Sequence, residues 1–294
     1  MKNIFLLIGA LSIAFSSMAQ DDLMGELDKN TKPKVSYATA TFKSTRVING
    51  HSIESMAAKH LDFRISHRFG AINSGYKELF GLDQSKVRFS LEYGITDDLM
   101  VGVGRSSYQK TYDYFIKYKL LKQSSGARNM PVSVSLFVSD ATNTLDSSPS
   151  LTFYNNLERQ NYCGQILIAR KFSDNISFQI SPTVLHRNKT EEADDPNTLV
   201  AIGLGGRAKI SKRTSINAEY WLTPQTRSSI YTNCFSVGFD IETGGHVFQL
   251  HFTNSRGMVE NQFIGQTTGK WGSGDIFYGF NISRTFSFDR TTKK

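Results

Sequence analysis

The residues with the clearest chemical potential lie close together near residue 250. His251, Thr253 and Ser255 occupy alternate positions, and Asn254 lies among them. A histidine beside a serine can take the proton of the hydroxyl and make the oxygen a nucleophile. The set therefore raises the hypothesis of a lipid acyl hydrolase. Its alternative is a polar network that only holds the chain in place.

Other residues of chemical interest are too scattered to indicate a centre. No pair of the six histidines has the four-residue spacing, or the nearby cysteine, that would indicate a metal site. Asn49-Gly50-His51 instead predicts a tight bend in which Gly50 supplies a positive φ angle. The chain has a formal charge of +8 but no zinc-finger or aromatic-basic motif. We therefore expect no metal, no cofactor and no nucleic-acid partner.

Charged side chains form a more informative set, because they fall at alternate positions of extended segments. The basic members are Arg64, Arg68, Arg88, Lys117, Lys119, Lys171, Arg207 and Lys209, and the acidic members are Asp62, Glu92, Asp113, Glu219 and Asp240. If these positions line the lumen of a barrel, eight bases against five acids give a mildly positive interior that prefers small anionic solutes. The alternative is that the charges pair across a narrow, plugged lumen that conducts nothing.

These side chains must be positioned by twelve segments of alternating apolar and polar residues between Leu61 and Phe288. Short connections at 96–98, 173–175, 211–213 and 242–245 alternate with long ones such as 70–85, 140–160, 187–197 and 254–274. Alternation of this kind indicates half-buried strands. An even strand number, with short turns at one rim and long loops at the other, is typical of bacterial outer-membrane barrels. The connection at 122–130 is long for a rim of short turns.

The polar faces of the strands distinguish two kinds of barrel. A soluble barrel buries its apolar face, whereas a membrane barrel turns that face to lipid. Here the polar faces are rich in Gly, Ser, Asn and charged residues, aromatic residues crowd the strand ends, and the last strand contains Phe286 and Phe288. We therefore predict an all-β fold, a twelve-stranded antiparallel transmembrane β-barrel of the outer membrane. The alternative is a soluble periplasmic barrel that binds an apolar ligand inside.

The chain that precedes the strands divides into two parts. Residues 1–19 have a positive start, an apolar run and a small-residue cleavage site near Ala19, which predicts a signal peptide. Residues 20–60 are expected to form a periplasmic spacer and a lumen plug, with Arg46, Asn49, His51 and Glu54 as the candidate plug residues. The barrel is expected over 61–288 and a short tail over 289–294.

The two cysteines are expected to be free. Cys163 and Cys234 fall on the inward faces of two strands that lie four strands apart. In a barrel of twelve strands such positions are separated by roughly 15–20 Å. That separation is beyond the reach of a disulfide.

Several segments of the chain resemble a known family. They are 45–54 (TRVINGHSIE), 67–70 (HRFG), 91–97 (LEYGITD), 100–107 (MVGVGRSS), 245–254 (GHVFQLHFTN) and 280–284 (FNISR). In these segments the chain is similar to the uncharacterised Bacteroidota family filed as domain of unknown function 5777. The resemblance implies an outer-membrane barrel without an assigned activity, and it implies no functional residue.

Three functional hypotheses follow. The first is a non-enzymatic outer-membrane barrel in contact with lipid, either a structural or partner-binding element with a periplasmic partner or a narrow, mildly anion-preferring channel. The second is an acyl hydrolase that uses His251 and Ser255, although strand parity points both side chains into the lumen and away from lipid. The third is the soluble barrel. We expect a protein without enzymatic activity.

Overall fold

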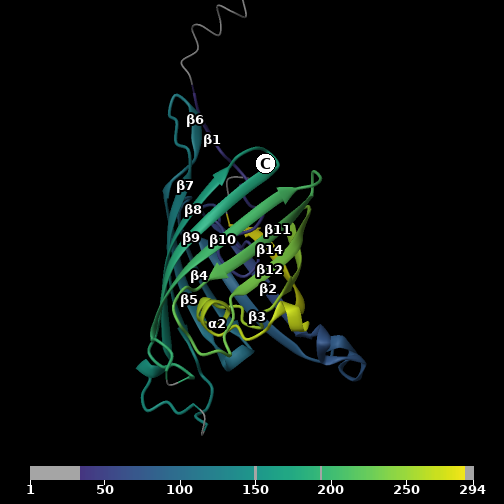
Figure 1. Cartoon of the computed structure of the whole chain (residues 1–294). Coiled ribbons are helices and arrows are strands. Elements are labelled where there is room, and N and C mark those ends of the chain that lie inside the picture. Colours follow the sequence, from purple (N-terminus) through teal and green to yellow (C-terminus); the bar gives the residue numbers. More distant parts are fainter. Residues whose placement is uncertain (1–33, 149–150, 193, 289–294) are drawn as a thin grey trace, which may run out of the picture. The chain divides into compact units, whose positions relative to one another are not determined.

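Twelve antiparallel strands form a closed barrel (Figure 1). The computed structural model describes residues 34–148, 151–192 and 194–288, so the predicted signal peptide, its cleavage site near Ala19 and the tail 289–294 lie outside the described residues. The barrel strands, in the order of the chain, are β2 (His60–Ala71), β3 (Ser85–Gly94), β4 (Leu99–Ser106), β5 (Tyr112–Leu121), β7 (Ser133–Thr142), β8 (Gln160–Lys171), β9 (Ile176–Arg187), β10 (Thr198–Lys209), β11 (Thr214–Leu222), β12 (Cys234–Thr243), β13 (His246–Thr253) and β14 (Phe277–Ser287). Each pairs with its neighbours in this order, and β14 pairs with β2 to close the ring. The predicted twelve-stranded fold is confirmed.

Side chains alternate between the two faces of each strand because successive residues of a strand point to opposite sides. In β9, Ser177, Gln179 and Ser181 are buried, whereas Phe178 and Ile180 are exposed. Polar residues therefore line the inside and apolar residues cover the outside, as in a membrane barrel. This arrangement is the reverse of a soluble barrel, so the hypothesis of a soluble protein with an apolar ligand inside is wrong.

The connections sort into two ends of the barrel (Figure 1). The short-turn end carries the tight connections, such as those at 95–98 and 172–175. The long-loop end carries the long loops, which contain η1 (Ile72–Ser74), η2 (Tyr76–Gly81), η3 (Tyr108–Lys110), η4 (Leu157–Arg159), α2 (Glu260–Gly265) and η5 (Trp271–Ser273). None of the helices in the described part of the chain is long and apolar enough to cross a membrane.

A second, smaller unit includes residues 34–37 and 124–129. In it, β1 (Val35–Tyr37) pairs antiparallel with β6 (Ser124–Gly126), and Val35 lies opposite Gly126. Gly126 has a φ of 89°, a conformation that residues with a side chain rarely adopt. β6 belongs to the β5–β7 connection, which explains why this connection is longer than the other short turns.

Candidate functional site

Residues 42–54 form a hairpin inside the barrel, which we call the lumen hairpin. Its arms pair through an antiparallel bridge between Arg46 and His51, and every residue from 44 to 53 is buried. Both flanks of the hairpin lie at the short-turn end, because the Ala38 N–H donates to the Gln123 carbonyl at 2.9 Å and the Lys59 N–H to the Gly94 carbonyl at 2.8 Å. The candidate plug residues Arg46, Asn49 and His51 are buried within it, and Glu54 is half-buried at its end.

Glu219 of β11 holds the turn of the lumen hairpin. Its carboxylate accepts the backbone N–H groups of Ile48 at 3.1 Å, Asn49 at 3.2 Å and Gly50 at 2.9 Å. The indole N–H of Trp221 donates to the same carboxylate at 2.9 Å. Successive N–H groups that converge in this way form a concave site for an anionic oxygen. One buried side chain therefore satisfies three backbone donors of the turn.

Gly50 is needed for a different reason from the one predicted. The expected positive φ is wrong, because Gly50 is not among the residues in the left-handed region. A Cβ at this position would lie only 2.5 Å from a ring carbon of Trp221. Glycine therefore allows the turn to approach the indole and the Glu219 carboxylate closely.

Side chains of four further strands complete the hydrogen bonds of the hairpin's carbonyl groups. The donor and acceptor residues are Gln179 and His51 (2.8 Å), Gln249 and Val47 (3.1 Å), Asn281 and Ile48 (3.1 Å), and Lys117 and Ser52 (3.2 Å). Arg207 of β10 donates to the Ala40 carbonyl, just before the hairpin, at 2.7 Å. A buried carbonyl without a partner costs free energy comparable to a lost hydrogen bond. The lumen wall thus supplies the partners that water would otherwise supply.

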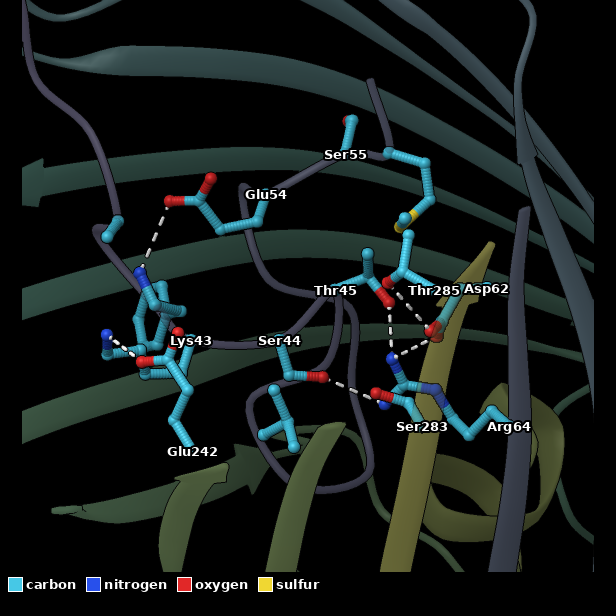
Figure 2. Close-up of a pocket in the computed structure, with 14 residues that line it drawn as sticks. Lys43, Ser44, Thr45, Glu54, Ser55, Asp62, Arg64, Glu242, Ser283 and Thr285 are labelled. Carbon is cyan, nitrogen blue, oxygen red and sulfur yellow. Dashed lines mark hydrogen bonds and ion pairs between the residues drawn. The ribbon is translucent and has the colours of Figure 1, made fainter. Parts of the chain in front are cut away.

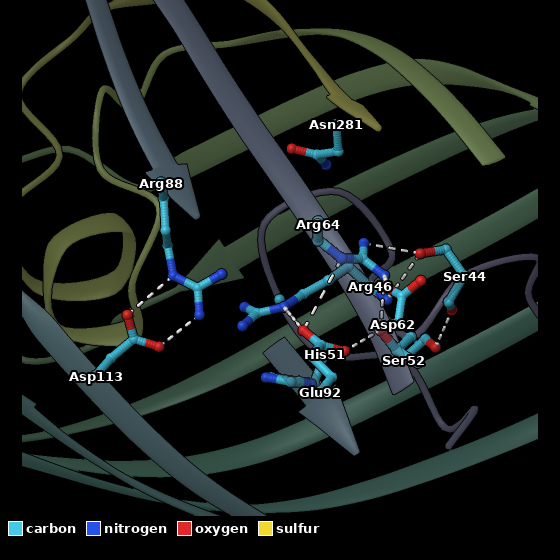
Figure 3. Close-up of polar contacts among 12 residues, drawn as sticks. Ser44, Arg46, His51, Ser52, Asp62, Arg64, Arg88, Glu92, Asp113 and Asn281 are labelled. Atoms are coloured by element: carbon cyan, nitrogen blue, oxygen red, sulfur yellow. Dashed lines mark hydrogen bonds and ion pairs between the residues drawn. The ribbon is translucent and has the colours of Figure 1, made fainter. Parts of the chain in front are cut away.

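Charged side chains of β2 and β3 hold the first arm of the hairpin (Figure 3). Arg64 donates to the Ser44 hydroxyl at 2.9 Å and to the Thr45 hydroxyl at 2.8 Å, and it pairs with Asp62 at 3.1 Å. The Thr45 hydroxyl donates in turn to Glu92 at 2.6 Å. These contacts form a buried chain in which each charge has a partner of opposite sign or a hydroxyl, as a charge removed from water requires.

Apolar side chains pack on another side of the hairpin. Phe42, Val47 and Ile53 form a buried cluster with side chains that point inward from β4, β5, β7 and β8, namely Met100, Phe115, Phe137, Leu167 and Ala169. The His51 ring packs against those of Phe115 and Phe137, with centroids 4.5 Å and 4.2 Å away. Burial of each large apolar side chain contributes about 1.5–3 kcal/mol, so this cluster adds to the polar contacts of the hairpin.

The connection between β13 and β14 folds into the lumen from the long-loop end. Its helix α2 is buried along its whole length. Phe263 and Ile264 of α2 pack in a second apolar cluster with Cys163, Leu185, Leu199, Ala201, Trp221 and Cys234. The ring centroids of Phe263 and Trp221 lie 5.2 Å apart. A polar contact also holds α2 in place, because Gln262 donates a hydrogen bond to the Thr111 hydroxyl at 2.9 Å.

The lumen hairpin and α2 meet inside the barrel. Arg46 Nη1 lies 3.3 Å from Glu260 Oε1, and each of the two side chains is only 4% exposed. His51 Nε2 lies 4.0 Å from the same oxygen. Two segments that enter from opposite ends of the barrel are therefore joined by a buried ion pair.

The structure places the predicted lumen-lining residues on the inward face. Arg64, Arg68, Arg88, Glu92, Lys117, Arg207, Glu219 and Asp240 are buried, while Lys119 and Lys209 are half-buried near the short-turn end. Most of them bind the hairpin or one another. Arg68 donates to the Asn49 side-chain oxygen at 2.8 Å, and Gln249 donates to Asp240 at 3.0 Å. Arg88 forms a two-pronged contact with Asp113, away from the hairpin (Figure 3).

The buried charges of the described residues are balanced in number. The seven basic ones are Arg46, Arg64, Arg68, Arg88, Lys117, Arg187 and Arg207, and the seven acidic ones are Asp62, Glu92, Asp113, Asp195, Glu219, Asp240 and Glu260. The count from the sequence omitted two of these acids, Asp195 and Glu260, and two of these bases, Arg46 and Arg187. The expected positive surplus is therefore confined to half-buried lysines near the short-turn end, Lys119, Lys171 and Lys209.

The candidate hydrolase residues lie on the inward side of the barrel and are buried. The Ser255 hydroxyl accepts the Gly257 N–H at 3.2 Å, and no hydrogen bond joins Ser255 to His251 among the described residues. Thr253 accepts a hydrogen bond from Ser236 at 2.8 Å, and Asn254 donates to the Gly269 carbonyl at 2.8 Å. These contacts anchor the start of the β13–β14 connection.

Cys163 and Cys234 are free and buried, as predicted. Both belong to the apolar cluster that receives α2. In the described ranges, no three metal-ligating side chains come close enough to hold an ion.

Several residues that hold the two inner segments were not predicted. Gln179, Gln249 and Asn281 are amides at inward positions of regular strands, so parity alone could have singled them out. Trp221 also follows strand parity and could have been placed in the lumen. Glu260 gives no such signal, because it lies in a long loop without periodicity.

A cavity of about 310 Å³ remains beside the hairpin (Figure 2). Lys43 and Glu242 form an ion pair at one side of it, and Asp62 and Arg64 form another across from them. Ligand pockets usually measure about 300–1,000 Å³. The space left in this part of the lumen is therefore at the lower limit of that range.

Strand number, outward apolar surface and filled interior together define a membrane β-barrel whose lumen is occupied by its own chain. Within this class, residues 42–286 match the family described as membrane bound beta barrel domain (DUF5777). The match covers most of the chain, so the protein belongs to this family, and the resemblance seen in the sequence is confirmed.

Some solved membrane barrels are similar in fold. The NanC porin matches with a TM-score of 0.48 and 7% identity, over 77% of this chain and 98% of that one. An outer-membrane channel from Pseudomonas putida F1 matches with a TM-score of 0.47 and 13% identity, over 80% and 98%. Outer membrane phospholipase A from Escherichia coli, as an active-site mutant, matches with 0.45 and 10%, over 84% and 98%. At these scores the likenesses carry no weight for the activity of this chain. Among curated proteins, none matches significantly.

Proposed function

We propose that this protein is an outer-membrane barrel that is closed at rest by the lumen hairpin and has a structural or partner-binding role. The observation that carries the proposal is the fit of the hairpin, whose turn binds Glu219 and whose carbonyl groups bind side chains of four further strands. A segment that only passed through a wet pore would leave these groups to water. The outward apolar face and the family match support the membrane location.

The orientation that we propose puts the short-turn end in the periplasm and the long-loop end outside, as is usual for bacterial outer-membrane barrels. The flanks of the hairpin then lie on the periplasmic side. A signal peptide cleaved near Ala19 would deliver the chain to that compartment. In this orientation the N-terminal segment can meet a periplasmic partner, and the outward strand faces contact outer-membrane lipid.

A narrow channel is the second candidate function, and three half-buried lysines favour it. Lys119, Lys171 and Lys209 face inward near the short-turn end. If the hairpin left the lumen, these side chains would attract small anions. Anion-selective conductance that arises only when the hairpin is removed is the outcome that would support a gated channel.

We also propose that the barrel is not an acyl hydrolase. His251 and Ser255 face the lumen, whereas an enzyme that acts on bilayer lipid must present its nucleophile to that lipid. Purified protein mixed with phospholipid vesicles should release no fatty acid. Release that disappears in a Ser255→Ala variant would contradict this proposal.

Planar-bilayer recordings test the closed state. The wild-type protein is expected to show no steady conductance. A variant that lacks residues 38–58 is expected to conduct, once heat-modifiable migration on a gel has shown that its barrel is folded. Steady conductance of the wild-type protein would overturn the proposal.

A single substitution tests the same point in a chain of full length. Asn49 Nδ2 lies 3.7 Å from Cys234 Sγ, so Asn49→Cys puts a thiol beside a native one. Oxidation would then tie the hairpin to β12. Any brief openings of the barrel should vanish on oxidation and return with reductant. Asn49→Ser is the matched control, because it cannot form the disulfide and should not respond to oxidation.

A further inference from the structure

We infer that this barrel couples its two membrane sides without opening: the lumen hairpin and α2 stabilise each other, so a change in the outer loops alters how firmly the hairpin is held from the periplasmic side. The inference rests on the orientation proposed above. It does not depend on whether the hairpin blocks conductance, because the coupling is carried by contacts between the two segments.

The first of these contacts is the pair of Arg46 and Glu260. Arg46 belongs to the hairpin and Glu260 is the first residue of α2, and their side-chain atoms lie 3.3 Å apart. The same Arg46 nitrogen donates to the Asn49 carbonyl at 2.8 Å, so the guanidinium also braces the turn. If Glu260 withdrew, the remaining carboxylate near Arg46 would be that of Glu92 at 3.9 Å. A buried charge that loses a close partner is costly.

A second contact between the hairpin and α2 is made by Trp221, an inward-facing side chain of β11. Its indole N–H donates to the Glu219 carboxylate that holds the hairpin turn. Its ring packs on Phe263 of α2, with centroids 5.2 Å apart. Gly50 of the turn approaches the same ring so closely that a Cβ would lie 2.5 Å from it. Movement of α2 therefore changes the surroundings of the side chain that supports the turn.

α2 is in turn held by other outer loops. The Ile264 carbonyl accepts a hydrogen bond from Arg227 at 3.0 Å, and the Thr232 N–H donates to the Thr267 carbonyl at 2.8 Å. Asp195 links a further loop to these, because it accepts the Ser228 N–H at 2.7 Å. The described parts of three loops, 188–192 with 194–197, 223–233 and 254–276, are thus one connected cap. A molecule that binds and displaces this cap at the outer surface would displace α2 with it.

Linkage makes this inference quantitative. If docking of α2 strengthens docking of the hairpin by some factor, docking of the hairpin must strengthen docking of α2 by the same factor. Coupling of this kind usually amounts to about 5- to 150-fold. Loosening α2 should therefore weaken docking of the hairpin by the same factor by which loosening the hairpin weakens docking of α2. A substitution that only disturbs its own segment would not give equal factors.

Hydrogen–deuterium exchange of the full-length protein in lipid nanodiscs tests the coupling. The amides of residues 45–52 report on the hairpin, and those of 258–266 report on α2. Glu260→Ala is expected to speed exchange in the hairpin about 5- to 30-fold, at the lower part of the usual coupling range. The same substitution should have little further effect on the hairpin in an Arg46→Ala background, because the contact is already lost.

Two variants serve as controls. Glu78→Ala removes an exposed carboxylate from a long loop outside the cap and should change hairpin exchange less than 2-fold. Glu260→Gln keeps an acceptor oxygen for Arg46 and should have a smaller effect than Glu260→Ala. Unchanged exchange of the strand amides would show that each variant is folded.

Two results would overturn the inference. In one, Glu260→Ala loosens α2 while hairpin exchange stays within 2-fold of the wild type. In the other, the effects of Arg46→Ala and Glu260→Ala on the hairpin simply add. Neither result bears on bilayer conductance, so a closed barrel without coupling, or a conducting barrel with coupling, would be recognised as such.

Discussion

The lumen hairpin and α2 occupy the same barrel but are held by different kinds of contact. Most backbone groups of the hairpin do not form hydrogen bonds with one another. Polar side chains of the surrounding barrel strands form hydrogen bonds with them instead. α2 inserts Phe263 and Ile264 into an apolar seat, and its polar contacts are fewer. The first mode depends on the direction of each hydrogen bond, whereas the second depends on filled volume.

This difference predicts how each segment can be released. A buried donor or acceptor that loses its partner costs about 1–3 kcal/mol, so the hairpin should respond sharply to the loss of one well-placed side chain. An apolar seat loses stability in proportion to the volume removed. The hairpin should therefore be released by the loss of a single hydrogen-bond partner, whereas α2 should loosen by degrees as packed volume is removed.

Glu219→Ala is expected to give the largest effect of any single substitution in the lumen. It would leave the N–H groups of Ile48, Asn49 and Gly50 without their acceptor. At about 1–3 kcal/mol for each group, and with tenfold for every 1.4 kcal/mol, exchange of these amides should rise at least about 100-fold. Hydrogen–deuterium exchange of the folded protein measures this.

Glu242→Ala is the matched control for that substitution. Glu242 also contacts the hairpin, through Lys43, but its side chain is 44% exposed. Exposed ion pairs contribute about 0–1 kcal/mol, so exchange should rise less than tenfold. Equal effects of the two substitutions would show that the hairpin is not held by the hydrogen bonds of its turn.

Phe263→Ala should loosen α2 more than the hairpin. Removal of a buried phenylalanine costs about 3–5 kcal/mol, and Phe263 is completely buried against Trp221 and its neighbours. Exchange in residues 258–266 should therefore rise by two orders of magnitude or more, and the hairpin should follow only by the coupling factor. Leu157→Ala, at an exposed leucine of another long loop, should leave both segments unchanged. A larger effect on the hairpin than on α2 would reverse the comparison.

Gly50→Ala should loosen the hairpin turn by steric conflict. The added methyl would lie 2.5 Å from the Trp221 ring, and overpacking of this kind typically costs about 1–3 kcal/mol. Trp221→Phe makes room but removes the indole donor to Glu219. In the double variant, the Gly50→Ala effect on exchange should therefore shrink. An equal effect in both backgrounds would mean that Trp221 is not the obstacle.

The sequence was sufficient for the strands because every strand meets lipid on one face and the lumen on the other. Alternation fails where the lumen is itself apolar. Leu167, Leu199 and Ala201 face inward against the hairpin or α2, so apolar residues fall on both faces of their strands β8 and β10. α2 has only six residues, too few for a helical period to stand out from a loop. The sequence indicates a lumen plug only because residues 37–60 precede the predicted barrel strands and belong to none of them.

A pH change should distinguish the two segments through groups of opposite behaviour. Burial, followed by the nearby charge of Arg46, lowers the pKa of His51 well below 6.5. The stability that neutral His51 allows is thus present above about pH 6.5 and is lost as the pH falls below it. Burial raises the pKa of Glu260, despite the charge of Arg46. Its contribution is present below about pH 4.5 and is lost as the pH rises through the raised pKa.

Glu260→Gln removes one of these opposing groups, and comparison with a second variant that also lacks His51 isolates the contribution of the histidine. In this background, acidification from pH 7.5 to 5.5 should speed hairpin exchange up to about tenfold, after correction for the intrinsic rate, because one pH unit below 6.5 is worth about 1.4 kcal/mol. His51→Phe keeps a ring against Phe115 and Phe137 but cannot take a proton. The double variant should therefore lose the part of the pH response that comes from His51. The same response in both proteins would show that another group titrates, and that the hairpin's sensitivity to acid does not come from the side chain that faces α2.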